Sequence, residues 1–113
     1  MMISVEKHTP NVQVITITGR LDAFTVGDLR AQQDKLLEAG ERQFIIDLSA
    51  AEFMDSAGMA ALVALYKRSR HSDGGAVVLV KPQNPAAYRI LTLTRFDQVF
   101  TMAESVDEAL NFF

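Results

Sequence analysis

The stretch Phe44–Ser56, which reads F-I-I-D-L-S-A-A-E-F-M-D-S, decides the fold, and Ala57-Gly58 follow it directly. Its first part is an apolar run made up of Phe44, Ile45, Ile46 and Leu48. Such a run is typical of a strand that is buried on both faces of a sheet. After a short turn, Asp55-Ser56 opens a long amphipathic helical segment. We therefore expect the hydroxyl of Ser56 at the mouth between a buried strand and a helix N-terminus.

Alternating strand and helix patterns surround this stretch. The β-rich runs Ile3–Lys7 and Val12–Thr18 lie on either side of the turn signal Thr9-Pro10-Asn11, so they predict an N-terminal β-hairpin. Gly19 is expected to end the second strand of this hairpin. The further predicted strands are Gln43–Leu48, Ala76–Val80 and Val99–Met102. Each apolar run is short enough for a strand rather than a helix.

Four helices are predicted from capping and stop signals. The first helix is expected to start at Thr25 and Asp28 and to stop at Gly40, and the second to run from Ser56 to the break at Asp73-Gly74-Gly75. The third is expected to start at Asn84-Pro85 and to end at about Leu93, and the last to start at Ser105 and Glu108. The second helix repeats apolar residues every three or four positions and carries basic residues in its last turns. The residues that face the core of this helix are predicted to be Met59, Leu62, Val63 and Tyr66.

The predicted order β-β-α-β-α-β-α-β-α indicates an α/β fold. A hairpin followed by strand–helix alternation implies a mostly parallel mixed sheet with right-handed crossovers, one antiparallel N-terminal strand and helices packed on the sheet. We expect residues 1–113 to form a single domain. A chain of this size buries roughly 65% of its unfolded surface, which is enough for one core.

Composition narrows the classes of function. The net charge of −3 argues against a nucleic-acid partner, and the absence of cysteine excludes disulfides, thiolate catalysis and cysteine zinc sites. The two histidines are far apart, so neither a metal site nor a cofactor is predicted. The N-terminus lacks a signal-peptide pattern, and the stretch Ala57–Tyr66 is shorter than the ~18 residues of a membrane span. We expect a cytoplasmic protein.

Ser56 has three possible roles at a helix start. It or Asp55 can simply cap the helix, which is the commonest use of such residues and stabilises by ~1 kcal/mol. It can be a hydrolase nucleophile, but Met54 stands where a nucleophile elbow needs glycine. His71 lies 15 residues along the helix, roughly 22 Å away, which is too far for a general base, and His8 has no obvious route to the site. We therefore expect no enzymatic activity.

The third role is phosphorylation. A phosphate on Ser56 brings about −1.5 to −2 charges, which local backbone N–H groups can accept. Asp55 is adjacent, and Asp22 is expected nearby because it follows the end of a neighbouring strand. The added charge would be poorly matched to a docked partner that contacts Met54, Met59 and Phe53. Core packing is the alternative role for these three side chains, and for Phe53 it is the favoured one.

Two motifs resemble those of a known family. Ile46-Asp47-Leu48-Ser49 followed by Phe53–Gly58 resembles the signature of anti-sigma-factor antagonists in the STAS (sulphate transporter and anti-sigma factor antagonist) family. Gly19-Arg20-Leu21-Asp22 resembles the family's G-x-L-D element at the end of the second strand. The predicted order of elements also fits, so the resemblance covers essentially the whole chain.

The resemblance implies a partner-switching module of bacterial transcription regulation. In that family the unphosphorylated antagonist binds an anti-sigma factor that is also a serine kinase, which frees the sigma factor. The kinase phosphorylates a serine that corresponds to Ser56, and a phosphoserine phosphatase resets the cycle. By the same resemblance, Asp55 helps to orient the hydroxyl and Gly58 lets a partner approach closely. The residues expected to bind the partner or flank the site are Asp22, Thr25, Met54, Asp55, Ala57, Gly58 and Met59.

Other classes remain open. The same family includes accessory subunits of transporters and lipid-transport systems, and a nucleotide-sensing module is a further alternative, although neither phosphate-loop motif occurs in the sequence. A phosphoaspartate receiver domain would use Asp47 and Lys81, but Lys7-His8 stands where its acidic pair belongs. Asp47 is more simply explained as a strand-end aspartate that bonds nearby backbone.

Overall fold

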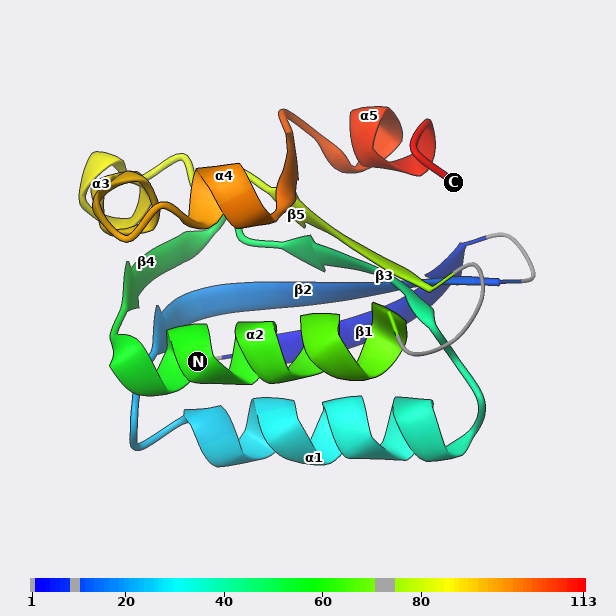
Figure 1. The fold of residues 1–113 in the computed structure, drawn as a ribbon. Helices are drawn as coiled ribbons and strands as arrows, with labels where there is room; N and C mark the ends of the chain where they lie inside the picture. Colours follow the sequence, from blue (N-terminus) through cyan, green and yellow to red (C-terminus); the bar gives the residue numbers. More distant parts are fainter. Residues whose placement is uncertain (1, 9–10, 71–74) are drawn as a thin grey trace.

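The computed structural model describes residues 2–8, 11–70 and 75–113 (Figure 1). Its strands are β1 (Met2–His8), β2 (Val12–Leu21), β3 (Gln43–Asp47), β4 (Ala51–Met54), β5 (Ala76–Val80) and β6 (Thr101–Ala103). Its helices are α1 (Val26–Glu38), α2 (Ser56–Arg70), α3 (Pro85–Leu93), α4 (Phe96–Val99) and α5 (Val106–Leu110). The predicted turn at Thr9-Pro10 and the predicted break at Asp73-Gly74 lie outside the described residues.

The strands form one mixed sheet in the order β1-β2-β3-β5-β6. β1 pairs with β2 antiparallel, whereas the β2–β3, β3–β5 and β5–β6 pairs are parallel. This arrangement confirms the predicted α/β class with one antiparallel N-terminal strand. The parallel pairs bring the C-terminal ends of β2 and β3 to the same edge of the sheet, where the Ser56 segment begins.

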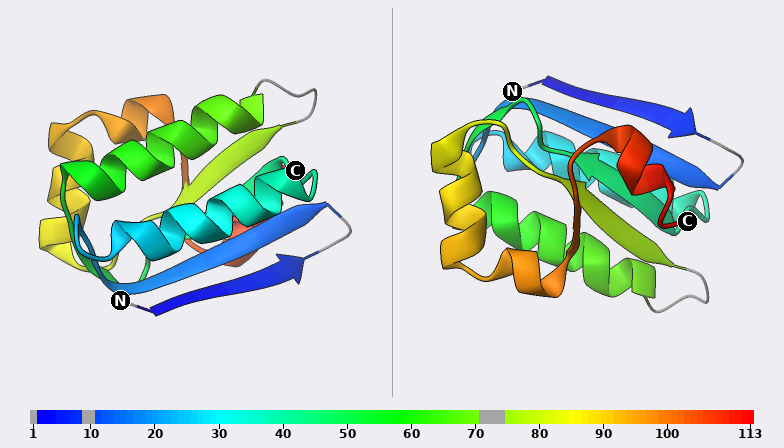
Figure 2. Two further views of the ribbon diagram at one scale, coloured as in Figure 1. Left: turned by 90° about the horizontal axis from the view of Figure 1, so that it is seen from below. Right: turned by 90° about the horizontal axis from the view of Figure 1, so that it is seen from above.

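Both faces of the central strand are covered, as its apolar run predicts. Phe44 and Ile46 belong to the larger core cluster, together with Leu62 of α2, whereas Ile45 belongs to a second cluster with Val78 and with Ala109 of α5. α1 and α2 lie side by side on one face, and α5 lies on the other (Figures 1 and 2). α3 and α4 lie beside the sheet, next to α2 and β4.

Two elements were not predicted. The sequence pattern predicts a short turn over the residues of β4, but β4 pairs in parallel with the end of β2 through Gly19, Arg20 and Leu21. The prediction that Gly19 closes β2 is therefore wrong. Its φ of +88° lies in the left-handed region, and the register shifts between Gly19 and Arg20. Glycine permits this bulge, which turns the end of β2 from β3 towards β4.

The second unpredicted element is α4, a single turn that begins after Arg95. Arg95 has a φ of +62°, an unusual conformation for a residue with a side chain. It redirects the chain from α3 into α4, so Val99 is helical and the last strand begins at Thr101 rather than at Val99. No glycine marks this turn, which is why the sequence pattern does not predict it.

The predicted helix caps differ in outcome. The Asn84 side chain accepts from the N–H groups of Ala86 and Ala87, with Pro85 at the first helical position, as predicted. Ser105 Oγ accepts from the Glu108 N–H as predicted, and Gly40 ends α1 with a φ of +93°. The predicted capping box of Thr25 and Asp28 is wrong, because the Thr25 side chain makes no cap bond to α1.

Candidate functional site

Ser56 is the first residue of α2, and its side chain is exposed. The capping bonds at this helix end are made by Asp55 instead: the N–H groups of Ala57 and Gly58 donate to Asp55 Oδ1 at 2.9 and 3.1 Å. Among the described residues, none forms a side-chain hydrogen bond with Ser56. The capping role considered for either residue therefore belongs to Asp55, and the Ser56 hydroxyl is open to solvent.

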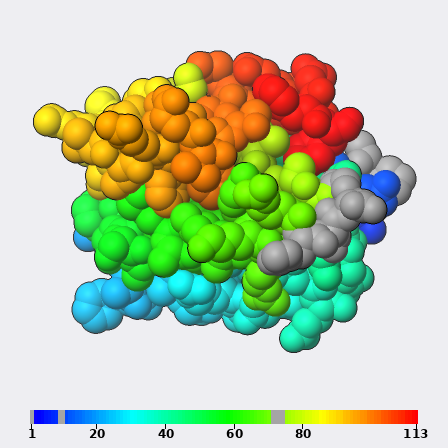
Figure 3. Space-filling view, viewed as in Figure 1, coloured from blue at the N-terminus to red at the C-terminus, as the bar shows by residue number. Residues whose placement is uncertain are grey.

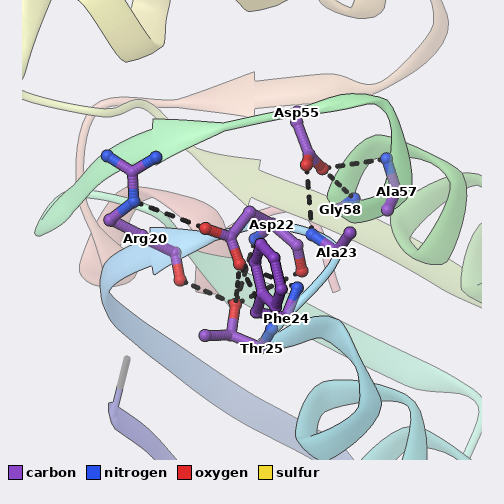
Figure 4. A network of polar contacts seen from close by, with 8 residues as sticks. All are labelled: Arg20, Asp22, Ala23, Phe24, Thr25, Asp55, Ala57 and Gly58. Carbon is purple, nitrogen blue, oxygen red and sulfur yellow. Dashed lines mark hydrogen bonds and ion pairs between the residues drawn. The ribbon is translucent and has the colours of Figure 1, made fainter.

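The second carboxylate oxygen of Asp55 links two parts of the chain. The N–H of Ala23, in the loop between β2 and α1, donates to Asp55 Oδ2 at 3.0 Å (Figure 4). The N–H of Asp55 in turn donates to the carbonyl of Leu21 at 3.2 Å. Three backbone N–H groups thus occupy the Asp55 carboxylate, so in this structure it positions the backbone and does not orient the Ser56 hydroxyl.

Asp22 organises the loop that Asp55 holds. Its Oδ1 accepts from the N–H groups of Phe24 and Thr25 at 3.0 and 3.2 Å, and Arg20 Nε lies 3.3 Å from Oδ2 (Figure 4). Thr25 Oγ1 donates to the carbonyl of Arg20 at 2.9 Å and accepts from the Asp22 N–H at 3.0 Å. The Thr25 hydroxyl therefore closes the loop rather than capping α1. Asp22 and Asp55 are close to each other, as expected, because both carboxylates accept hydrogen bonds from the same loop.

Opposing influences set the pKa of Asp22. Desolvation favours the neutral carboxyl and acts to raise the pKa, but the N–H of Phe24, the Thr25 hydroxyl and Arg20 all favour the charged form. The hydrogen bonds prevail, so the pKa of Asp22 lies below its ordinary value. Asp22 is therefore a carboxylate at neutral pH, and the site carries negative charge before any modification.

Gly58 faces the protein interior rather than a partner. It is buried, and a Cβ at this position would lie 2.6 Å from the Leu21 carbonyl oxygen and 2.7 Å from Leu21 Cγ. The expectation that Gly58 allows a partner to approach closely is not supported by this contact. Its small size lets the first turn of α2 pack against the end of β2.

The other expected site residues are placed differently from one another. Met54 is 1% exposed and belongs to the core, so its predicted contact with a partner does not fit its burial. Met59 is 7% exposed, and part of its side chain lines a surface groove. Ala57 is half-buried beside Ser56. Phe53 is also half-buried, and the Arg20 guanidinium lies over its ring at 4.3 Å from the centroid.

The groove runs along α2 from Ser56 and has a volume of about 510 Å³. Its lining is mainly apolar and consists of Ser56, Met59, Ala60, Val63, Ala64, Lys67, Thr94 and Phe96. The α2 residues are three or four positions apart and so share one face of the helix. In the space-filling view, α4 lies against this part of α2 (Figure 3). The Ser56 hydroxyl thus lies beside an apolar surface.

Sequence reasoning missed the α4 side of this groove, because Thr94 and Phe96 follow a turn without a local signal. The predicted role of Asp47 is confirmed, since its Oδ1 accepts from the Ser49 N–H at 3.0 Å. Lys81, which the receiver alternative paired with Asp47, instead bonds Glu104 at 2.9 Å.

Residues 2–8, 11–70 and 75–113, which the structure describes, contain neither a metal-binding cluster nor a membrane-spanning helix. In these ranges no cluster of three histidine, cysteine or acidic side chains is arranged to hold a metal ion. Over the same part of the chain, no helix has the length and apolar character needed to cross a membrane.

Comparison with known proteins identifies the family. The family model of the STAS domain matches residues 4–109. The chain belongs to the STAS family. The resemblance seen in the two sequence motifs is thereby confirmed over nearly the full length of the chain.

Relatives in this family bear the name that the motifs suggest. The anti-sigma F factor antagonist of Paenibacillus polymyxa is 25% identical over 111 residues, which is 97% of this chain and 92% of that protein. The crystal structure of an anti-sigma factor antagonist from Mycobacterium paratuberculosis has a TM-score of 0.85 at 29% identity and covers 97% of this chain and 91% of that one. The unphosphorylated antagonist SpoIIAA shares the fold with a TM-score of 0.76 at 22% identity, over 96% of this chain and 94% of that one.

Proposed function

We propose that this STAS protein is an anti-sigma factor antagonist that acts in the cytoplasm by partner switching. In its unphosphorylated form it binds an anti-sigma factor with serine kinase activity, and phosphorylation of Ser56 releases it. The names of its relatives support the first part of this proposal. The state of the Ser56 hydroxyl supports the second, and no nucleic acid is required as a partner.

The observation that carries the proposal is that the Ser56 side chain forms no hydrogen bond with the part of the chain that the structure describes. A serine at a helix start usually caps the helix, but Asp55 already supplies the capping oxygen here. The Ser56 side chain is exposed, as a kinase substrate must be. Ser56 also lines the apolar groove along α2, so a partner seated on that groove covers this residue.

Phosphorylation changes this surface strongly. The phosphate adds about −1.5 to −2 charges at neutral pH. The N–H groups of Ala57 and Gly58 could donate hydrogen bonds to a phosphate at a free helix end, but they already donate to Asp55. Burying the phosphate against the apolar groove under a partner is unfavourable because a buried charge without a counter-charge is costly. Release of the partner follows, and a phosphoserine phosphatase restores the binding form.

Phosphorylation is tested with purified protein, the anti-sigma factor kinase of the same organism and ATP. Mass spectrometry should find one phosphate on the wild type and none on Ser56→Ala. Ser105→Ala is the matched control, because Ser105 is also an exposed serine at a helix start, and it should still gain one phosphate. Incorporation into Ser56→Ala equal to that of the wild type would rule out Ser56 as the acceptor.

The charge switch is tested separately by titrating the anti-sigma factor with Ser56→Asp and Ser56→Asn. The two variants differ little in size, so a difference between them reports charge. We expect Ser56→Asp to bind at least about tenfold more weakly than Ser56→Asn, with both folded, since an acidic residue suits a helix N-terminus. Equal affinities of the wild type and both variants would contradict release by charge.

A further inference from the structure

Phe24 is the most exposed of the large apolar side chains among the described residues, at 98% of its full accessible area. It lies in the loop between β2 and α1 (Figure 4). Single exposed apolar residues are common on protein surfaces and need no special explanation by themselves. Two other features of this loop, its rigidity and its connection to Ser56, distinguish Phe24 from such residues.

The loop that carries Phe24 is held by hydrogen bonds from three consecutive backbone N–H groups to carboxylate oxygens. The Ala23 N–H donates to Asp55 Oδ2, and the Phe24 and Thr25 N–H groups donate to Asp22 Oδ1, over 3.0 to 3.2 Å. The Thr25 hydroxyl adds a bond of 2.9 Å to the Arg20 carbonyl. These bonds fix the backbone while the ring stays in solvent. A binding partner therefore meets an aromatic side chain on a preorganised backbone, and little backbone entropy is lost when the two bind.

The loop is also continuous with the surface around Ser56. The Ala23 N–H to Asp55 Oδ2 bond joins the residue before Phe24 to the residue before Ser56. Consecutive Cα atoms are about 3.8 Å apart, so the Cα atoms of Phe24 and Ser56 each lie about 3.8 Å from the Cα atom of a residue that forms this bond. An interface of standard size covers about 800 Å² of one partner, a disc of about 16 Å radius. An interface of this size that is centred on Ser56 therefore extends far enough to include Phe24.

From these observations we infer that Phe24 is an anchor for the anti-sigma factor, inserting its ring into an apolar pocket of that partner. This inference rests on the proposed function. Aromatic residues that are held rigidly and become fully desolvated provide much of the binding energy in protein interfaces. The partner accordingly needs two complementary features: a recess that accepts a phenyl ring, and an adjoining surface that covers Ser56 and the groove along α2.

The test measures binding of the purified anti-sigma factor by calorimetry and surface plasmon resonance. Phe24→Ala should raise Kd at least about tenfold, mainly through a faster off-rate, because mutations within one interface act mostly on dissociation. Phe24→Leu, which keeps most of the apolar volume, should recover most of the loss. Phe112→Ala is the matched control, since Phe112 is exposed (54%) near the C-terminus, and it should bind like the wild type.

The outcomes separate this inference from the proposed function. Thermal unfolding of Phe24→Ala should match that of the wild type, because the removed ring contacts little of the protein. If Ser56→Asp weakens binding but Phe24→Ala binds like the wild type, the anchor role is refuted and the proposed function stands. If the wild type binds no anti-sigma factor of its organism, both fail. Attachment to phosphatidylglycerol vesicles that Phe24→Ala abolishes, with unchanged affinity for the anti-sigma factor, would assign the ring to a membrane and overturn the inference.

Discussion

Gly58 packs directly against Leu21, so closely that a Cβ on Gly58 would lie 2.6 Å from the Leu21 carbonyl oxygen. The contact joins the first turn of α2 to the end of β2. It brings the Ser56 segment next to the Asp22 loop, although the two are more than thirty residues apart in the sequence. The spacing between Asp55, Ser56 and the loop therefore depends on a residue without a side chain.

The first prediction concerns this contact. Gly58→Ala should lower the free energy of unfolding by about 1–3 kcal/mol, because the backbone carbonyl of Leu21 cannot move aside without shifting β2 or α2. Gly27→Ala is the matched control, since Gly27 lies in α1 with nothing within 4 Å of its added Cβ, and it should not destabilise the protein. Urea unfolding measures both. A Gly58→Ala variant as stable as the wild type would contradict the packing role.

The second prediction concerns the two functions of the Asp55 carboxylate. Asp55→Ala removes a helix cap and the bond to the Ala23 N–H, so it should cost about 2 kcal/mol, at the upper end for a cap. Asn84→Ala also removes two capping bonds but no link to another loop, and should cost about 1 kcal/mol. Hydrogen exchange should show faster exchange of the Ala23 amide in Asp55→Ala only. Unchanged exchange of that amide would argue against the link.

The third prediction concerns acid stability. Because the pKa of Asp22 in the folded protein lies below the ordinary value of 3.8, its charged form is stabilised by folding. This contribution is fully present above about pH 4 to 5 and is lost as the pH falls through the lower folded pKa. Asp22→Asn should therefore reduce stability at pH 6 and approach the wild type near pH 2. A stability difference that is constant with pH would show that Asp22 contributes no charge-dependent stability.

Local patterns in the sequence were sufficient to predict most of the elements. The apolar run from Phe44 requires burial on both sides, and Asn84-Pro85 determines where α3 begins through its own capping bonds. These features act over a few residues, so they can be read without knowing the fold. The exposed helix start at Ser56 was predictable for the same reason, because a strand, a turn and an amphipathic helix follow one another directly.

The predictions failed where distant segments decide a conformation. β4 has only four residues and forms because it can pair with the end of β2, which no periodicity reveals. Likewise, the Thr25 hydroxyl bonds the Arg20 carbonyl instead of capping α1, a choice that depends on how the whole loop is closed. Met54 could equally have been a surface or core residue, and only the placement of β4 against the core assigned it.

The sequence by itself determined the mixed sheet, the hairpin at its start and the serine at a helix mouth, since these follow from hydrophobic period and capping chemistry along neighbouring residues. Only the tertiary structure decided that Asp55 caps α2 and holds the Ala23 loop. It also decided that Gly58 packs against Leu21 and that the Phe24 ring is exposed to solvent beside the site. These features arise from contacts between segments far apart in the chain, whose geometry is set when the sheet and helices pack together.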